Sequence, residues 1–129
     1  MSEPMKETYV MHGAVPLTVD DTDYNSVSLN CKIAKKFLIQ YSLTETGVLV
    51  DGDRVRILVK FSDDEVTWYG YNNGPFGVLY EEESTTPCAI SVSGDCVGEY
   101  MRITVTTDYT NADPTANYFT ITVKLTLMV

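Results

Sequence analysis

The stretch YFTITVKLTL, residues 118–127, alternates apolar and polar side chains over its whole length. The apolar set is Phe119, Ile121, Val123, Leu125 and Leu127, and the set between is Tyr118, Thr120, Thr122, Lys124 and Thr126. Successive side chains of a β-strand point to opposite faces of a sheet. The pattern therefore predicts a strand with one face in a core and the other in water.

Other segments repeat this alternation and indicate that strands dominate the fold. RVRILVKF, residues 54–61, and MRITVT, residues 101–106, show it clearly. Weaker strands are expected at residues 15–19, 27–31, 37–43, 68–71, 78–80 and 90–92. Turn residues separate them, as in DGD at 51–53, NNGP at 72–75, SGD at 93–95 and TNADPTAN at 110–117. About eight or nine short strands with regular turns predict an all-β chain, a single antiparallel β-sandwich of the jelly-roll kind over residues 15–129.

Residues 1–14 precede the first predicted strand and show no strand-like alternation, so we expect an extended N-terminal arm. Its apolar side chains are Met1, Met5, Tyr9, Val10 and Met11. Free termini of this kind are ordered only when a contact offsets the loss of backbone entropy, and methionine adapts its shape to a partner. We therefore predict that these five residues bind another protein chain.

The composition is that of an acidic globular domain. The chain has 129 residues, with nine Lys and Arg against eighteen Asp and Glu, and a formal charge of −9. Nucleic-acid binding depends on Lys and Arg that neutralise phosphates, so this balance argues against DNA or RNA as a partner. No apolar stretch approaches the length of a membrane span.

Cys31, Cys88 and Cys96 are the three cysteines, and the first residues, MSEPMKETYVMHG, do not resemble a secretory signal. An odd count without a signal favours free thiols, with Cys31 as a small core residue. A Cys88–Cys96 disulfide is the alternative. A two-residue turn at residues 93–94 would hold these two cysteines out of register.

The acidic segment KFSDDEVTWYGYNNG, residues 60–74, has three readings: an acidic active site, a metal loop or a charged hairpin turn. An active site would need paired carboxylates in a cleft, whereas these acids are consecutive and lie between two strand-like segments. The hairpin turn is the better prediction. Ser62, Asp64, Thr67 and Trp68 also match a degenerate Asp-box, in which the Asp binds the backbone of its own turn and the Trp packs beneath it. Glu65 stands where that pattern has glycine. With Trp68 in that structural role, we expect its replacement by alanine to cost about 3–5 kcal/mol if the ring is well buried.

Metal ligands are sparse in this sequence. Asp21, Asp23 and Asn25 open like an EF-hand, but Ser26 and Lys32 replace the required Gly and Glu. An incidental Ca²⁺ site in this loop or at residues 81–84 is the alternative to solvated turns. His12 is the only histidine, and we expect it to be an exposed arm residue rather than a ligand. No C-x-x-C pair occurs, and we expect no bound metal and no cofactor.

Catalytic motifs are also missing. The sequence has no G-x-S-x-G, no S-x-x-K and only one histidine to act as a base. It has no glycine-rich phosphate loop before a helix. We therefore predict no catalytic residues and a chain that is not an enzyme.

Several tyrosines leave a choice between two kinds of surface. They are Tyr69, Tyr71, Tyr80, Tyr100, Tyr109 and Tyr118. They suit a sugar-binding platform or, as the favoured reading, cross-strand contacts and a subunit interface.

The order of these segments resembles small β-sandwich virion proteins of tailed bacteriophages. The resemblance is carried by PLTVDDTDYNSVSL (16–29), RILVKFSDDEVTWY (56–69), EYMRITVTT (99–107) and YFTITVKLTLMV (118–129). It implies a capsid decoration or auxiliary protein, or a neck, tail or fibre component, made in the host cytoplasm and located in the virion. The implied partners are a major capsid or tail protein and further copies of the chain. A carbohydrate-binding module or host-surface adhesin is the alternative.

Overall fold

The computed structural model describes residues 6–70, 78–82 and 88–129. In this part of the chain ten strands form. They are β1 (Lys6–Leu17), β2 (Asp23–Asn25), β3 (Leu29–Asn30), β4 (Lys36–Thr46), β5 (Arg54–Ser62), β6 (Tyr69–Gly70), β7 (Val78–Glu82), β8 (Cys88–Asp95), β9 (Tyr100–Asp108) and β10 (Tyr118–Met128). The described residues hold no helix with the length and hydrophobicity needed to cross a bilayer.

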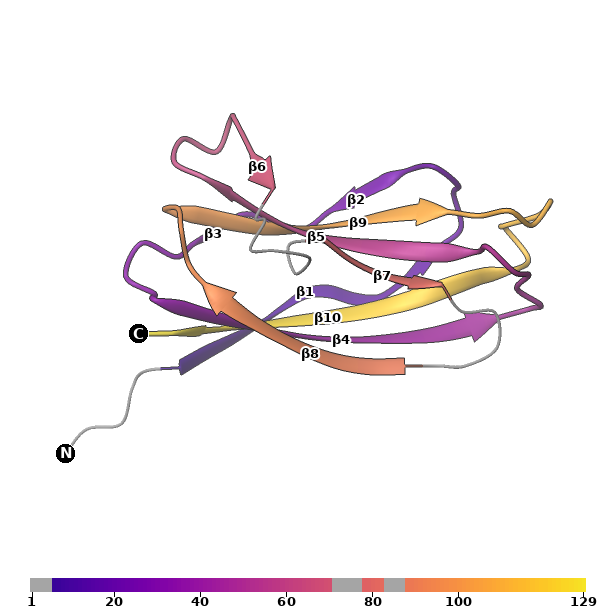
Figure 1. Ribbon diagram of the computed structural model, residues 1–129, viewed down its shortest axis with the longest axis horizontal. Coiled ribbons are helices and arrows are strands. Elements are labelled where there is room, and N and C mark those ends of the chain that lie inside the picture. Colours follow the sequence, from indigo (N-terminus) through magenta and orange to yellow (C-terminus); the bar gives the residue numbers. More distant parts are fainter. Residues whose placement is uncertain (1–5, 71–77, 83–87) are drawn as a thin grey trace.

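The strands form two antiparallel sheets that lie face to face (Figure 1). Sheet A has the order β1-β10-β4-β8. Sheet B has the order β2-β9-β5-β6, with β3 beside β9 and β7 beside β5. The chain passes repeatedly from one sheet to the other, which is the connectivity of a jelly roll. The predicted all-β jelly-roll sandwich is therefore confirmed.

The core fills the space between the sheets and is built from the alternating apolar positions of the long strands. Phe119, Ile121, Val123 and Leu125 of β10 are all buried, as the sequence pattern predicts. Phe37 of β4 meets Phe61 of β5 edge to face, with ring centroids 6.0 Å apart. Aromatic rings prefer this geometry, and here it joins the two sheets.

The first strand differs from its prediction. β1 begins at Lys6 and pairs with β10, so residues 6–14 belong to sheet A and are not an arm. The register shifts between Val10 and His12 and again between His12 and Val15, and Ala14 has φ of 51°. These β-bulges bury the neighbours Met11 and His12 together, which erases the alternation that would identify a strand.

The predicted turn at residues 93–94 is also wrong. β8 runs through Ser93 and Gly94 to Asp95 and pairs with β4 without a shift of register. Position 94 requires glycine because the ring of Phe37 lies against the backbone there: a Cβ would be 2.7 Å from the ring. The glycine lets the aromatic ring lie directly against the strand.

Candidate interaction surfaces

The acidic segment at residues 60–70 is a hairpin turn, as predicted. Lys60 pairs with Gly70 and Phe61 with Tyr69, so β5 and β6 are adjacent antiparallel strands. Residues 63–67 between them are exposed at the tip of the hairpin. The three carboxylates therefore do not form a cleft in which a proton could be transferred.

Ser62 and Asp64 organise this turn through the backbone. Asp64 Oδ1 accepts hydrogen bonds from the backbone N–H groups of Val66 (2.8 Å) and Thr67 (2.9 Å) and from the Ser62 hydroxyl (3.0 Å). The bonds from Thr67, Val66 and Ser62 hold the pKa of Asp64 below its usual range. Glu65 has φ of 60°, a left-handed conformation that glycine adopts without strain. The structural role expected of an Asp-box is thus present, with Glu65 in the strained position.

Trp68 lies on the outer side of sheet B and is only partly buried. The guanidinium carbon of Arg102 lies 4.4 Å from the centre of a Trp68 ring. The expected cost of about 3–5 kcal/mol for replacing Trp68 by alanine assumed a well-buried ring. Trp68 does not meet this condition. A cation–π contact at such a site contributes about 0.5–1 kcal/mol.

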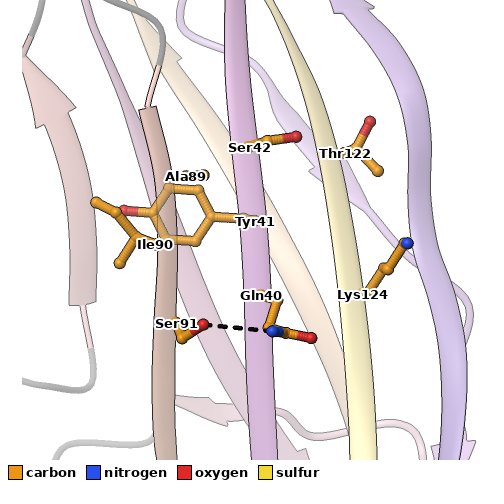
Figure 2. Close-up of a pocket in the computed structure, with 8 residues that line it drawn as sticks. All are labelled: Gln40, Tyr41, Ser42, Ala89, Ile90, Ser91, Thr122 and Lys124. Carbon is orange, nitrogen blue, oxygen red and sulfur yellow. Dashed lines mark hydrogen bonds between the residues drawn. The ribbon is translucent and has the colours of Figure 1, made fainter.

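The outer surface of sheet A is a flat face of small polar side chains, which we call the hydroxyl face. Gln40 and Ser42 come from β4, Ala89 and Ser91 from β8, and Thr122 and Lys124 from β10. They line an open hollow of about 280 Å³, and Gln40 Nε2 donates a hydrogen bond to Ser91 Oγ at 3.4 Å (Figure 2). The face offers hydroxyl, amide and ammonium groups that can form hydrogen bonds with another surface.

A smaller, more apolar hollow lies where β1 begins and β10 ends, and we call it the terminal hollow. It has a volume of about 90 Å³ and is lined by Glu7, Tyr9, Asn30, Cys31, Ile33, Ala34, Leu127 and Val129. Ile33 is 75% exposed and Val129 is 48% exposed. Isolated apolar side chains are common on surfaces, but these two flank one hollow.

The residues predicted to bind a partner do not form one surface. Met11 is 7% exposed and belongs to the core, so its predicted role is wrong. Tyr9 packs against the core and lines the terminal hollow, while Val10 is exposed. Met1 and Met5 lie outside the described residues.

His12 is buried in β1, which corrects its prediction as an exposed arm residue. Its Nε2 lies 3.0 Å from the carbonyl oxygen of Ile103 in β9, so it must carry the proton and donate. The bond joins the two sheets through the core. Burial lowers the pKa of His12, although the bond to the Ile103 carbonyl acts in the opposite direction.

The loop singled out for a possible cation contributes to a polar hollow. Asp21 and Asp23 line it together with Asp108 and Arg56. Among the described residues no three His, Cys, Asp or Glu side chains are arranged to hold a metal ion. The other segment considered for Ca²⁺, residues 81–84, lies outside the part whose side chains are described.

The tyrosines considered as a sugar platform lie in different environments. Tyr109 is buried: its hydroxyl donates to the Leu17 carbonyl at 2.6 Å and accepts from the Phe119 N–H at 2.9 Å. Tyr118 packs against the core, and Tyr69 is 68% exposed on the hairpin. The side chains of Tyr71 and Tyr80 lie outside the described part.

The described cysteines are free thiols. Cys31 is buried, as predicted, and its Sγ donates to the Gly98 carbonyl at 3.2 Å. A hydrogen bond with the Cys96 thiol, together with burial, raises the pKa of Cys31. Because Cys96 is free, the alternative Cys88–Cys96 disulfide is not formed.

Asp53 is a buried residue whose role was not expected from the sequence. Its carboxylate accepts hydrogen bonds of 2.6 to 3.0 Å from the backbone N–H groups of Val50, Thr110 and Asn111 and from Asn111 Nδ2. Burial alone would raise the pKa of Asp53, but these bonds outweigh burial and lower it. The only signal in the sequence is the turn pattern DGD, which accounts for the bond from Val50, whereas Thr110 and Asn111 lie more than fifty residues further along the chain.

Comparison with known proteins gives a structural similarity only. No protein-family profile and no curated protein sequence matches the chain. The fold is similar to that of a chain in the structure of infectious bursal disease virus, Gx strain, with a TM-score of 0.58 and 10% sequence identity. The match covers 98% of this chain and 32% of that chain, so this chain spans about a third of the length of its neighbour. At this identity the two chains share a fold, and nothing more follows from the match itself.

Proposed function

We propose that the chain is a structural protein of a virus particle and acts by binding other proteins. The observation that carries the proposal is the jelly-roll order of strands, matched over 98% of the chain in the structure of a virus. Virus capsid domains are among the proteins that use this architecture. The hydroxyl face and the terminal hollow are the surfaces best suited to such contacts.

A more specific role follows from the sequence resemblance. We propose a capsid decoration or auxiliary protein of a tailed bacteriophage, with a neck or tail position as the variant of this role. The partners would then be a major capsid or tail protein and further copies of the chain. Such a protein stabilises the particle by occupying symmetric positions on it.

The proposed role is not enzymatic. Asp64 at the tip of the β5–β6 hairpin binds the backbone of its own turn, and Asp63 accepts a hydrogen bond from the Glu99 N–H. The residues that line the hydroxyl face include no histidine or carboxylate that could act as a base. A carbohydrate-binding role is the weaker candidate because Tyr109 is used in the core and Tyr118 packs against it.

Mass spectrometry of purified particles tests this proposal. Particles from the source that encodes the chain are banded on a density gradient and digested with trypsin. The tryptic peptides 37–54 and 103–124 should be detected in the gradient fractions that contain the infectious particles. They should remain there after the particles are washed with high salt. If they occur only in the soluble fractions, the chain is not a particle component.

A further inference from the structure

The two margins of sheet A differ in how they are protected from pairing with another chain. An edge strand exposes unpaired N–H and C=O groups, and proteins block it with bulges, charges or proline. β1 has all three: Lys6 and Glu7 near its start, two shifts of register, and Pro16 near its end. It is therefore a poor template for an additional strand.

β8, on the opposite margin, has almost none of this protection. It pairs with β4 over eight consecutive residues without a shift of register, and no described strand lies on its other side. Its sequence CAISVSGD contains no proline and carries its only charge at Asp95. Ala89, Ser91 and Ser93 are exposed and small, so an approaching strand meets no bulky side chain.

The described margins of sheet B are less suitable. β2, β3 and β6 have only two or three residues each, and β7 has five and ends in Glu81 and Glu82. Short or charged edge strands are another form of protection. Among the described strands, β8 is thus the long edge strand with a single charge, at its last residue.

The sequence of β8 also suits pairing with itself. In an antiparallel pair related by a twofold axis at Ser91, Ser91 faces its own copy, Ile90 faces Val92 and Ala89 faces Ser93. The two Asp95 residues then lie at opposite ends of the paired segment. The contact brings no like charges face to face, which matters for a chain with a net charge of −9.

We propose that two copies of the chain associate through antiparallel pairing of their β8 strands, which joins two copies of sheet A into one continuous sheet. The hydroxyl face then extends across both copies, because Ala89, Ser91 and Ser93 lie on it or beside it. Backbone hydrogen bonds supply the affinity, as in other cases of strand addition. The inference deepens the proposed function, which requires several copies of the chain on one particle, by naming the edge at which copies meet.

A charge-exchange experiment on the full chain tests the pairing. Sedimentation velocity is measured for the native chain, for Ser91→Lys, for Ser91→Glu and for an equal mixture of the two variants. The buffer contains about 0.3 M salt, which screens the net repulsion between acidic chains. The native chain should self-associate, each variant alone should associate about fivefold more weakly or worse, and the mixture should recover association.

Thr8→Lys is the matched control, since Thr8 is exposed on the protected margin of the same sheet. It should associate like the native chain, and circular dichroism should show that all variants are folded. A monomeric native chain, an unchanged Ser91→Lys variant, loss of association in Thr8→Lys, or a mixture that stays monomeric would each overturn β8 pairing. If the mixture of Ser91 variants recovers association but purified particles lack the chain, the proposed function is rejected and β8 pairing is retained. If the particles contain the chain but the mixture stays monomeric, only β8 pairing is rejected.

Discussion

The hydroxyl group of Tyr109 connects two strands of the sandwich. It bridges the end of β1 and the start of β10 through the Leu17 carbonyl and the Phe119 N–H, and its ring stacks on that of Phe119. Tyr109→Phe keeps the ring but leaves both buried backbone groups without this partner. We expect the free energy of unfolding to fall by about 1–3 kcal/mol in urea denaturation.

Tyr69→Phe is the control for this prediction, because Tyr69 is 68% exposed. A surface change of this kind should stay within about 0.5 kcal/mol of the native chain. Equal stability of Tyr109→Phe and the native chain would show that the hydroxyl bridge does not contribute.

His12 makes the stability of the chain depend on pH. Its pKa is lowered in the folded protein from an ordinary value of 6.5, so below that pH the unfolded chain binds a proton that the folded chain does not. The stabilising contribution of neutral His12 is therefore complete above about pH 6.5 and falls as the pH decreases. His12→Gln should show a smaller loss of stability than the native chain between about pH 7.5 and 5.5.

Unfolding free energies of both proteins at several pH values measure this difference. Carboxylates that titrate at lower pH are common to both chains, so the difference isolates His12. Parallel pH profiles would contradict the assignment.

Single residues also mark the limit of what the sequence predicts. The roles of Ser62 and Asp64 could be predicted because all their turn partners lie within three residues. The clamp made by Asp53 and the bond of His12 could not, since Thr110 and Ile103 are 57 and 91 residues away from them and become neighbours only in the folded sandwich. Trp68 was expected to be more buried because the motif says nothing of Arg102, which lies over its ring.

At the scale of elements, β1 is part of the fold. Tyr9, Met11, Val15 and Leu17 on this strand contribute to the core or pack against it. Removing residues 1–14 would expose β10 along one side, so we expect this truncated chain to be unfolded or to lose its cooperative thermal transition. An extended arm, as expected from the sequence, would not be needed for folding.

Removing residues 1–5 is the matched deletion, because it leaves β1 intact. Circular dichroism and thermal melting should show a folded chain. A cooperative, native-like transition after removal of residues 1–14 would contradict the role given to β1.

Two loops at one end of the sandwich are held together by Asp53. Its carboxylate joins the β4–β5 turn to the segment that follows β9. Asp53→Asn removes the negative charge. It also replaces one acceptor oxygen by an NH₂ group, which cannot accept hydrogen bonds from the surrounding N–H groups. We expect a loss of about 2–4 kcal/mol, because hydrogen bonds to a charged acceptor are worth more than neutral ones.

Asp51→Asn, at an exposed position in the same turn, should leave stability almost unchanged. Urea denaturation of both variants checks the prediction. If Asp53→Asn is as stable as Asp51→Asn, the carboxylate does not clamp the loops.

Strands could be predicted from the sequence where one face of the strand is buried along its whole length, without a β-bulge. The segments expected at residues 54–61, 101–106 and 118–127 correspond to β5, β9 and β10 with small changes at their ends. β1 was missed because two bulges disturb its alternation. The Ser-Gly pair in β8 was taken for a turn because the sequence does not reveal that Gly94 is needed for contact with Phe37.

At the scale of the whole molecule, the jelly-roll architecture is the observation behind our proposal that this chain is a subunit of a virus particle. The fold class, an antiparallel jelly-roll sandwich, followed from periodicity and turn chemistry, whereas the order of the strands in each sheet and the surface proposed for assembly did not. The alternation fixes which side chains enter the core but leaves the exposed face and the sheet margins free to vary. The surfaces proposed for partner contacts, β8 and the hydroxyl face, are therefore recognised only in the folded chain.

Electron cryo-microscopy of the purified particles tests this claim most directly. We expect density for this chain in symmetric copies, with two sheets in the order β1-β10-β4-β8 and β2-β9-β5-β6. A map at a resolution that separates strands, in which every ordered region is explained by other proteins and none fits this sandwich, would contradict it.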